Sequence, residues 1–159
     1  MTVKIENADE LKRIMEVLRS FPEEADYITA YGSGDDHPEL YDVDVLGDFA
    51  EAVCGEEFEN LKNDIVNSFY QLYSFDFQNS HEGVETFYEN LYVYNRKEDV
   101  ERAAEWFINN GMTDIGKIMK QGYESAEKEK LAAKWINDNT STIYAAYIKI
   151  MFEFEEKYL

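Results

Sequence analysis

The negative charge of this chain is concentrated in one stretch, and this concentration limits how the stretch can fold. Between Ser20 and Asn95 there are 18 acidic residues and one basic residue, Lys62, which amounts to −17 of the chain's net charge of −19. Carboxylates repel one another and resist burial, so a compact fold must place them on outward faces. The stretch therefore predicts amphipathic elements with an acidic side, and we expect the charge to serve binding.

The remaining composition indicates a folded domain rather than an acidic tail. Hydrophobic residues make up 45% of the chain and aromatic residues 15%, whereas disordered acidic segments are poor in aromatics. We expect a single domain over residues 1–159. The lone Cys54 excludes an internal disulfide and fits a reducing compartment, and no apolar run or signal peptide points to a membrane. We therefore expect a cytoplasmic location and no membrane partner.

Apolar spacing predicts an all-α, or nearly all-α, fold, namely a bundle of seven or eight helices. Capping residues and glycine or asparagine stops mark the helix ends. The segments expected to be helical are residues 7–20, a short one from 22, a short one over 48–53, 56–73, 81–94, a stripe over 100–107 with a stop at 109–111, 113–122, 125–136 and 143–158.

Residues 27–46 are the least regular part of the chain. The alternation of Tyr41, Val43 and Val45 with two aspartates is typical of a strand. A small hairpin and an irregular loop both fit this segment, and both stay open at this point.

Two of the expected helices carry most of the ordered acidic residues. In helix 56–73 the apolar side chains, from Phe58 to Leu72, fall on one side and the acids on the other. In helix 81–94, Val84, Phe87 and Tyr88 point inward and the acids outward. The carboxylates expected to bind a partner, called here the acid set, are Glu56, Glu57, Glu59, Asp64, Glu82, Glu85 and Glu89, with Asp42, Asp44, Asp48 and Glu51 from the preceding segment.

One short pattern resembles the signature of the nucleotidyltransferases. Gly32-Ser33 follows an apolar segment, and Asp42 and Asp44 form an Asp-x-Asp pair on the next one. The resemblance implies a turn that holds a triphosphate and two aspartates that hold Mg²⁺. The pattern lacks a third carboxylate on a later strand, and no basic residue between Arg19 and Lys62 could help to hold phosphate. Despite these two departures, the Gly-Ser turn and the Asp-x-Asp pair make a Mg²⁺-dependent nucleotidyltransferase an alternative prediction.

Other chemistry finds little support in the sequence. The spacing of an EF-hand is absent, and His37 and His81 with one cysteine make no tetrahedral zinc set. Negative neighbours of Cys54 blunt it as a nucleophile, and it is expected to be a small core residue. We expect no catalytic residue, no metal and no cofactor, and hence no enzyme.

Residues 76–90, which read DFQNSHEGVETFYEN, resemble a bacterial family known mainly from an acidic DNA-mimic protein. Its motif is of the type Asn-x-Gly-Gly-Phe-x-Gln-Phe-Phe-x-Asn, followed by a helix and an Ile-Gly turn. The matches are Gly83, Phe87-Tyr88, Asn90, Ala103-Ala104 and Asp114-Ile115-Gly116. The departures are Glu82, Val84 and Thr86, and the resemblance covers about residues 60–125. It implies a mostly helical fold and does not by itself imply mimicry.

Charge and resemblance favour the same function. Acids three or four apart on a helix lie about 5–6 Å apart on its surface. DNA presents a charge every ~3.4 Å of axis per strand, so two or three such helices could imitate its charge density. The sequence therefore predicts a DNA mimic that inhibits a basic nucleic-acid-binding protein, such as a repressor, nucleoid protein, restriction enzyme or CRISPR effector. It predicts no direct contact with nucleic acid. A generic acidic interaction module is a further alternative, and a homodimer stays open.

Overall fold

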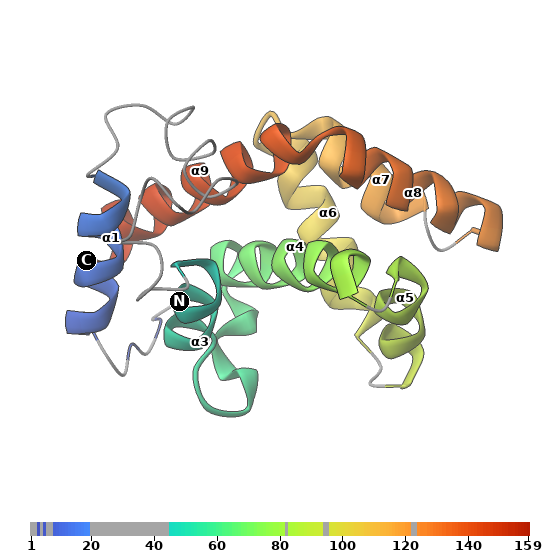
Figure 1. Cartoon of the computed structure of the whole chain (residues 1–159). Helices are drawn as coiled ribbons and strands as arrows, with labels where there is room; N and C mark the ends of the chain where they lie inside the picture. The colour runs from blue at the N-terminus through green and yellow to red at the C-terminus, as the bar shows by residue number, and fades with distance from the viewer. Residues whose placement is uncertain are drawn as a thin grey trace.

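The computed structural model describes residues 3, 5, 8–19, 45–81, 83–93, 96–121 and 124–159, and for 45, 56, 57, 79–81 and 91–93 it describes the backbone alone (Figure 1). These residues form eight α-helices and one 3₁₀-helix, and no strand. They are α1 (Ala8–Arg19), α3 (Val45–Cys54), η2 (Glu56–Lys62), α4 (Asp64–His81), α5 (Val84–Val93), α6 (Lys97–Asn109), α7 (Thr113–Gln121), α8 (Ala126–Asp138) and α9 (Thr140–Tyr158). The all-α prediction is confirmed. The expected helix from residue 22 and residues 27–44 of the expected hairpin lie outside this part of the chain.

Helix α4 is the central element of the structure. It packs against α3, η2, α5, α6, α8 and α9. In Figure 1 it runs across the middle of the molecule, with α9 along one side, α3 at one end and α5 at the other. Its residues Ile65, Val66, Phe69, Leu72 and Phe75 are all buried. Because neighbours surround it, α4 has apolar residues on more than one face.

The predicted helix 56–73 is wrong, because the chain forms two helices there. Asn63 separates them, and its extended backbone ends η2. Its side-chain Oδ1 accepts hydrogen bonds from the backbone N–H groups of Ile65 at 3.0 Å and Val66 at 3.2 Å. This asparagine supplies the acceptor that the first turn of α4 needs. The acids of η2 therefore do not continue the helical face of α4.

Phe58, predicted to be a core residue, lies on the surface with 40% of its area exposed. Its φ of 59° is left-handed, a conformation that bulky residues rarely adopt. Both the 3₁₀ winding and this angle turn the ring away from the interior. The prediction for residues 56–73 assumes an α-helical period, which does not hold in the 3₁₀-helix η2.

Three helix boundaries also differ from those predicted. Helix α4 continues to His81 through the expected break at 74–80, and Gly83, with φ of 99°, makes the turn into α5. Helix α3 begins at Val45, three residues earlier than expected, so the strand pattern does not extend to this residue. The break between α8 and α9 is a single residue, Asn139, instead of 137–141.

The C-terminal half agrees with the expected stops and caps. Helix α6 ends at Asn109, and Gly111 has φ of 80°. The Ser125 hydroxyl accepts a hydrogen bond from the Lys128 N–H at 3.2 Å, which caps α8. No helix in the described ranges is both long and apolar enough to cross a bilayer.

Two parts of the family-like segment meet at the crossing of α6 and α7. Ala103 and Ala104 are buried in α6, as predicted. Gly116 lies inside α7, where the family resemblance implied a turn. A Cβ at Gly116 would lie 2.4 Å from the carbonyl oxygen of Ala104 and 2.7 Å from Cγ1 of Ile108. The two helices approach this closely because neither the alanine nor the glycine carries a larger side chain.

Gly116→Ala should therefore destabilise the fold by about 2 kcal/mol, because a backbone carbonyl cannot move aside as a side chain can. The exposed neighbour Lys117→Ala is the matched control and should change stability by less than about 0.5 kcal/mol. Urea denaturation measures both. Equal stabilities for the two variants would contradict the close crossing.

A half-buried carboxyl group joins α4 to α9. The Tyr147 hydroxyl lies 3.0 Å from Oδ2 of Asp76 and 3.2 Å from the carbonyl oxygen of Leu72. Burial raises the pKa of Asp76 above its ordinary value of 3.8, and the Tyr147 hydrogen bond lowers it by a smaller amount. A hydroxyl has one proton for two acceptors. When Asp76 is protonated it can donate to Tyr147, which then donates to Leu72.

Asp76→Asn should stabilise the protein by about 1 kcal/mol at pH 7, because its amide donates permanently to Tyr147. The folded state holds the Asp76 proton more tightly than the unfolded chain does. The wild-type carboxyl therefore favours folding most below pH 4, and this contribution is lost as pH rises through the raised pKa. The advantage of the variant should grow from pH 4 to pH 7 in urea denaturation. An advantage independent of pH would contradict this assignment.

Candidate functional site

The described members of the acid set divide into two groups at the ends of α4. An 18-residue helix is about 27 Å long. Glu51, Glu59 and Asp64 belong to α3, η2 and the first turn of α4, at one end. Glu85 and Glu89 belong to α5, at the other end (Figure 1). The acids thus do not form the continuous face of two consecutive helices that the sequence predicted.

The group at the start of α4 is exposed but partly neutralised. Glu51, Glu59 and Asp64 are all exposed, and Asp48 is half-buried in the first turn of α3. Arg102 of α6 donates from Nε to Oδ1 of Asp64 at 3.0 Å. An exposed pair of this kind adds little to stability, but it reduces the charge that Asp64 presents.

The group at α5 includes an acid that the sequence analysis missed. Glu85 and Glu89 are exposed one helical turn apart, and Glu129 of α8 lies close enough to interact with both. Burial raises the pKa of Glu129 above its ordinary value of 4.5, and the charges of Glu85 and Glu89 raise it further. Because α5 packs on α8, this cluster draws on residues 40 positions apart. Periodicity within one helix cannot reveal such a pairing.

The remaining members of the acid set are outside the part of the structure that can be described. These are Asp42, Asp44 and Glu82, and the Gly32-Ser33 turn of the nucleotidyltransferase pattern lies there too. For Glu56 and Glu57 the backbone lies in η2, and their side chains are not described.

A stripe of uncharged polar residues runs along one face of α4, and the sequence analysis missed it. Asn67, Gln71, Ser74 and Gln78 follow one another at spacings of four, three and four residues, which places them on a single side of the helix. This polar stripe begins in the core, where Asn67 and Gln71 are fully buried. The amide spacing was visible in the sequence, but the expected break at 74–80 concealed it.

The buried half of the polar stripe is hydrogen-bonded. Nδ2 of Asn67 donates to the backbone carbonyl of Asp99 at 2.9 Å, and Nε2 of Gln71 donates to Oδ1 of Asn67 at 3.2 Å. These bonds tie α4 to the start of α6. Ser68, also on α4, is buried, and its hydroxyl has no hydrogen-bond partner in the described structure.

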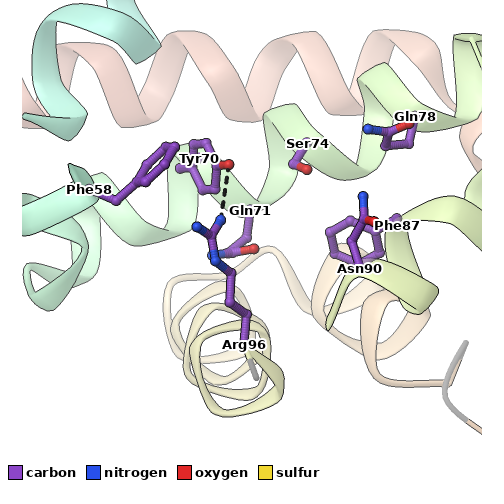
Figure 2. A pocket seen from close by; sticks show the side chains of 8 residues that line it. All are labelled: Phe58, Tyr70, Gln71, Ser74, Gln78, Phe87, Asn90 and Arg96. Atoms are coloured by element: carbon purple, nitrogen blue, oxygen red, sulfur yellow. Dashed lines mark hydrogen bonds between the residues drawn. The ribbon is translucent and has the colours of Figure 1, made fainter. Parts of the chain in front are cut away.

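The outer half of the polar stripe lines a cavity of about 320 Å³ (Figure 2). The cavity lies among η2, α4, α5 and the residue that precedes α6. Its described lining is Phe58, Tyr70, Gln71, Ser74, Gln78, Phe87, Asn90 and Arg96. These residues supply three aromatic rings, three amides, two hydroxyls and one formal charge.

Arg96 closes one end of the cavity. Its Nη1 donates to the hydroxyl of Tyr70 at 3.2 Å, and its guanidinium carbon lies 4.7 Å from the ring centroid of Phe58. The rings of Phe58 and Tyr70 are themselves 5.1 Å apart. The strained backbone at Phe58 thus places its ring where it can contact both the arginine and the tyrosine.

The surroundings of the single thiol and of the potential metal ligands indicate no reactive site among the described residues. Cys54 is buried, as predicted, and burial raises the pKa of its thiol to about 12, although Arg96 opposes the shift. Among the described residues, no group of three or more His, Cys, Asp or Glu side chains is placed to hold a metal ion.

Comparison of the chain with protein families, curated proteins and solved structures gave no match. The likeness to the DNA-mimic family remains a prediction that rests on the residues quoted for it. Inferences about function accordingly depend on the chain's own charge, packing and cavity.

Two adjacent buried polar residues of α4 should respond in opposite directions to truncation. Asn67→Ala leaves the carbonyl of Asp99 and the amide of Gln71 without a partner and should cost about 3 kcal/mol. Ser68→Ala removes an unpaired hydroxyl and should leave stability unchanged or raise it by up to about 1 kcal/mol. Chemical denaturation of the two variants tests this, and a large loss for Ser68→Ala would contradict the environment assigned to it.

Proposed function

We propose that this protein is an acidic DNA mimic, which binds and inhibits a basic nucleic-acid-binding protein through its carboxylates. The observation that carries the proposal is the imbalance between Ser20 and Asn95, where 18 acids face one base. A surface of this kind competes for the Lys and Arg side chains that otherwise contact phosphates. Its long-range field also accelerates the encounter with a basic partner.

The helical geometry supplies spacings that suit a phosphate backbone. Glu85 and Glu89 are one turn apart, so their Cβ atoms lie about 5–6 Å from each other. The two acidic groups lie toward opposite ends of α4, so they are separated along its axis as phosphates are along a DNA strand. The division into two groups therefore suits a partner that contacts DNA at more than one point along its axis.

The cluster of Glu85, Glu89 and Glu129 argues against charge that serves solubility alone. Solubility needs dispersed carboxylates, which repel one another little. Here burial raises the pKa of Glu129, and the nearby charges of Glu85 and Glu89 from a second helix raise it further, which disfavours folding at neutral pH. Basic side chains of a bound partner relieve this repulsion, so a binding role explains why the protein keeps an arrangement that lowers its stability.

The test uses a pool of DNA-binding proteins eluted from DNA-cellulose and passed over the immobilised chain. We expect basic proteins to be retained at low salt and released both by high salt and by added duplex DNA, because the DNA and the mimic share a binding site. Glu85→Gln with Glu89→Gln should weaken retention about tenfold.

Glu98→Gln with Glu127→Gln is the matched control, since it removes two exposed charges outside the acid-rich stretch. It should retain the partner like the wild type. Failure of duplex DNA to displace the retained proteins would refute mimicry. Equal losses in both double variants would instead mean that net charge matters and the α5 cluster does not.

A further inference from the structure

The cavity beside the polar stripe lies between elements that carry the two acidic groups. At about 320 Å³ it falls in the lower part of the range for binding sites of small molecules, so it has room for one large side chain and not for a helix. Phe58 at one end belongs to η2, next to the exposed Glu59. Asn90 at the other end belongs to α5, next to the exposed Glu89 (Figure 2). A partner that contacts both glutamates therefore has the cavity between its contacts.

The charges beside the cavity and within it differ. No carboxylate is among the described residues of the lining, and the formal charge there is the guanidinium of Arg96. The exposed Glu59 and Glu89 attract basic side chains, whereas Arg96 and the loss of water oppose the entry of a lysine or arginine. The arrangement therefore places the basic side chains of a partner on the rim and an uncharged side chain inside.

The walls of the cavity favour an aromatic side chain with a polar edge. The rings of Phe58 and Tyr70 are tilted against each other with centroids 5.1 Å apart, and Phe87 lines the cavity farther along α4. Rings gain from tilted or offset contacts with other rings beyond what burial alone supplies. Ser74 and Asn90 are half-buried, so an entering side chain displaces water from them, and an N–H or O–H group can replace the hydrogen bonds of that water. Tryptophan and tyrosine have both properties, and leucine has neither.

The backbone at Phe58 supports a role in binding. Its φ of 59° is one that a bulky residue adopts at a cost, and 40% of its area is nevertheless exposed. Strained residues of this kind are concentrated at sites that bind ligands. A partner's side chain in the cavity would cover apolar area of this ring that the unbound protein exposes.

We propose that the cavity is the anchor site of the acidic surface, and that it takes one tryptophan or tyrosine side chain from a basic segment of the partner. This inference rests on the proposed function, because the acids supply the attraction that brings the segment to the cavity. A few buried aromatic side chains carry most of the binding energy at many interfaces. The anchor thus selects among basic proteins at short range, which a long-range field does not do.

The test uses short acetylated and amidated lysine peptides with a central tryptophan, leucine or alanine, and a neutral tryptophan peptide in which glutamine replaces lysine. Isothermal titration calorimetry of the full chain at low salt measures their affinities. The lysine–tryptophan peptide should bind about tenfold more tightly than the alanine peptide and severalfold more tightly than the leucine peptide. It should also bind about tenfold more tightly than the neutral peptide, and it should shift the side-chain amide signals of Asn90 in NMR spectra.

Two variants alter the cavity from different sides. Ser74→Leu fills it. Phe58→Gly removes the ring at one end and relieves the left-handed backbone, so this variant should unfold at a denaturant concentration similar to that of the wild type. Both variants should lose the preference for tryptophan and keep the wild-type affinity for the alanine peptide. Leu131→Ala is the matched control, because Leu131 is an exposed apolar residue of α8 outside the described lining, and it should keep the preference.

A variant of the acidic surface separates the anchor from the charge. Glu85→Gln with Glu89→Gln should weaken the binding of all three lysine peptides by the same factor, about tenfold. Their ratio of affinities should stay as in the wild type, because the cavity is unchanged.

Three results would overturn the proposal. The first is equal affinity of the wild type for the three lysine peptides, which refutes the anchor and leaves the acidic surface in place. The second is a neutral tryptophan peptide that binds as tightly as the lysine one, as expected of a site for uncharged small molecules. The third is an undiminished preference for tryptophan in folded Phe58→Gly and Ser74→Leu proteins. Failure of mimicry itself is a separate result, since duplex DNA then does not displace the retained proteins.

Discussion

The fold depends on a central helix whose buried amide side chains are hydrogen-bonded to each other and to α6. Helix α4 is packed against six other elements, and Asn67, Ser68 and Gln71 lie in its interior contacts. An unpaired amide in such a place costs more than a paired one contributes. The bonds from Asn67 to Asp99 and from Gln71 to Asn67 therefore constrain how α6 can sit against α4. Asn63 adds the cap that defines where the helix begins.

The acidic groups and the cavity occupy different parts of this arrangement. The acidic proposal depends on the length of α4, which places the exposed carboxylates of η2 and α5 toward its two ends. The cavity arises where the polar stripe leaves the core, at the junction of α4, α5 and Arg96. One helix thus both spaces a charged surface and supplies the polar wall of a pocket.

Patterns within a short segment correctly predicted the helix faces and helix ends that depend on that segment alone. The stripe of Val100, Ala103 and Phe107 and the glycine stop at Gly111 are found as expected, because helical period and left-handed backbone are properties of short segments. The predictions were wrong where packing against other elements, and not the spacing of apolar residues, decides the structure. Phe58 is exposed because η2 is a 3₁₀-helix. The break expected at 74–80 is absent because neighbouring helices on several sides support α4 through a segment rich in Ser, Asn and Gln.

The candidate sites were predictable to different degrees. The exposure of Glu85 and Glu89 follows from their position outside the inward face formed by Val84, Phe87 and Tyr88. Their proximity to Glu129 depends on the packing of α5 against α8, which no pattern in either helix encodes. The spacing of the polar stripe can be seen in the sequence. Phe58 and Arg96, in contrast, line the cavity only because of the tertiary structure.

Native-state hydrogen exchange of the backbone amides of α4 tests most directly whether this helix is the element on which the others depend. If it is, the amides from Phe69 to Phe75 should exchange only through global unfolding, with a free energy equal to that from denaturant titration. The amides of α5 and η2 should open at lower free energy. Exchange of the α4 amides through a local opening, well below the global free energy, would contradict the account.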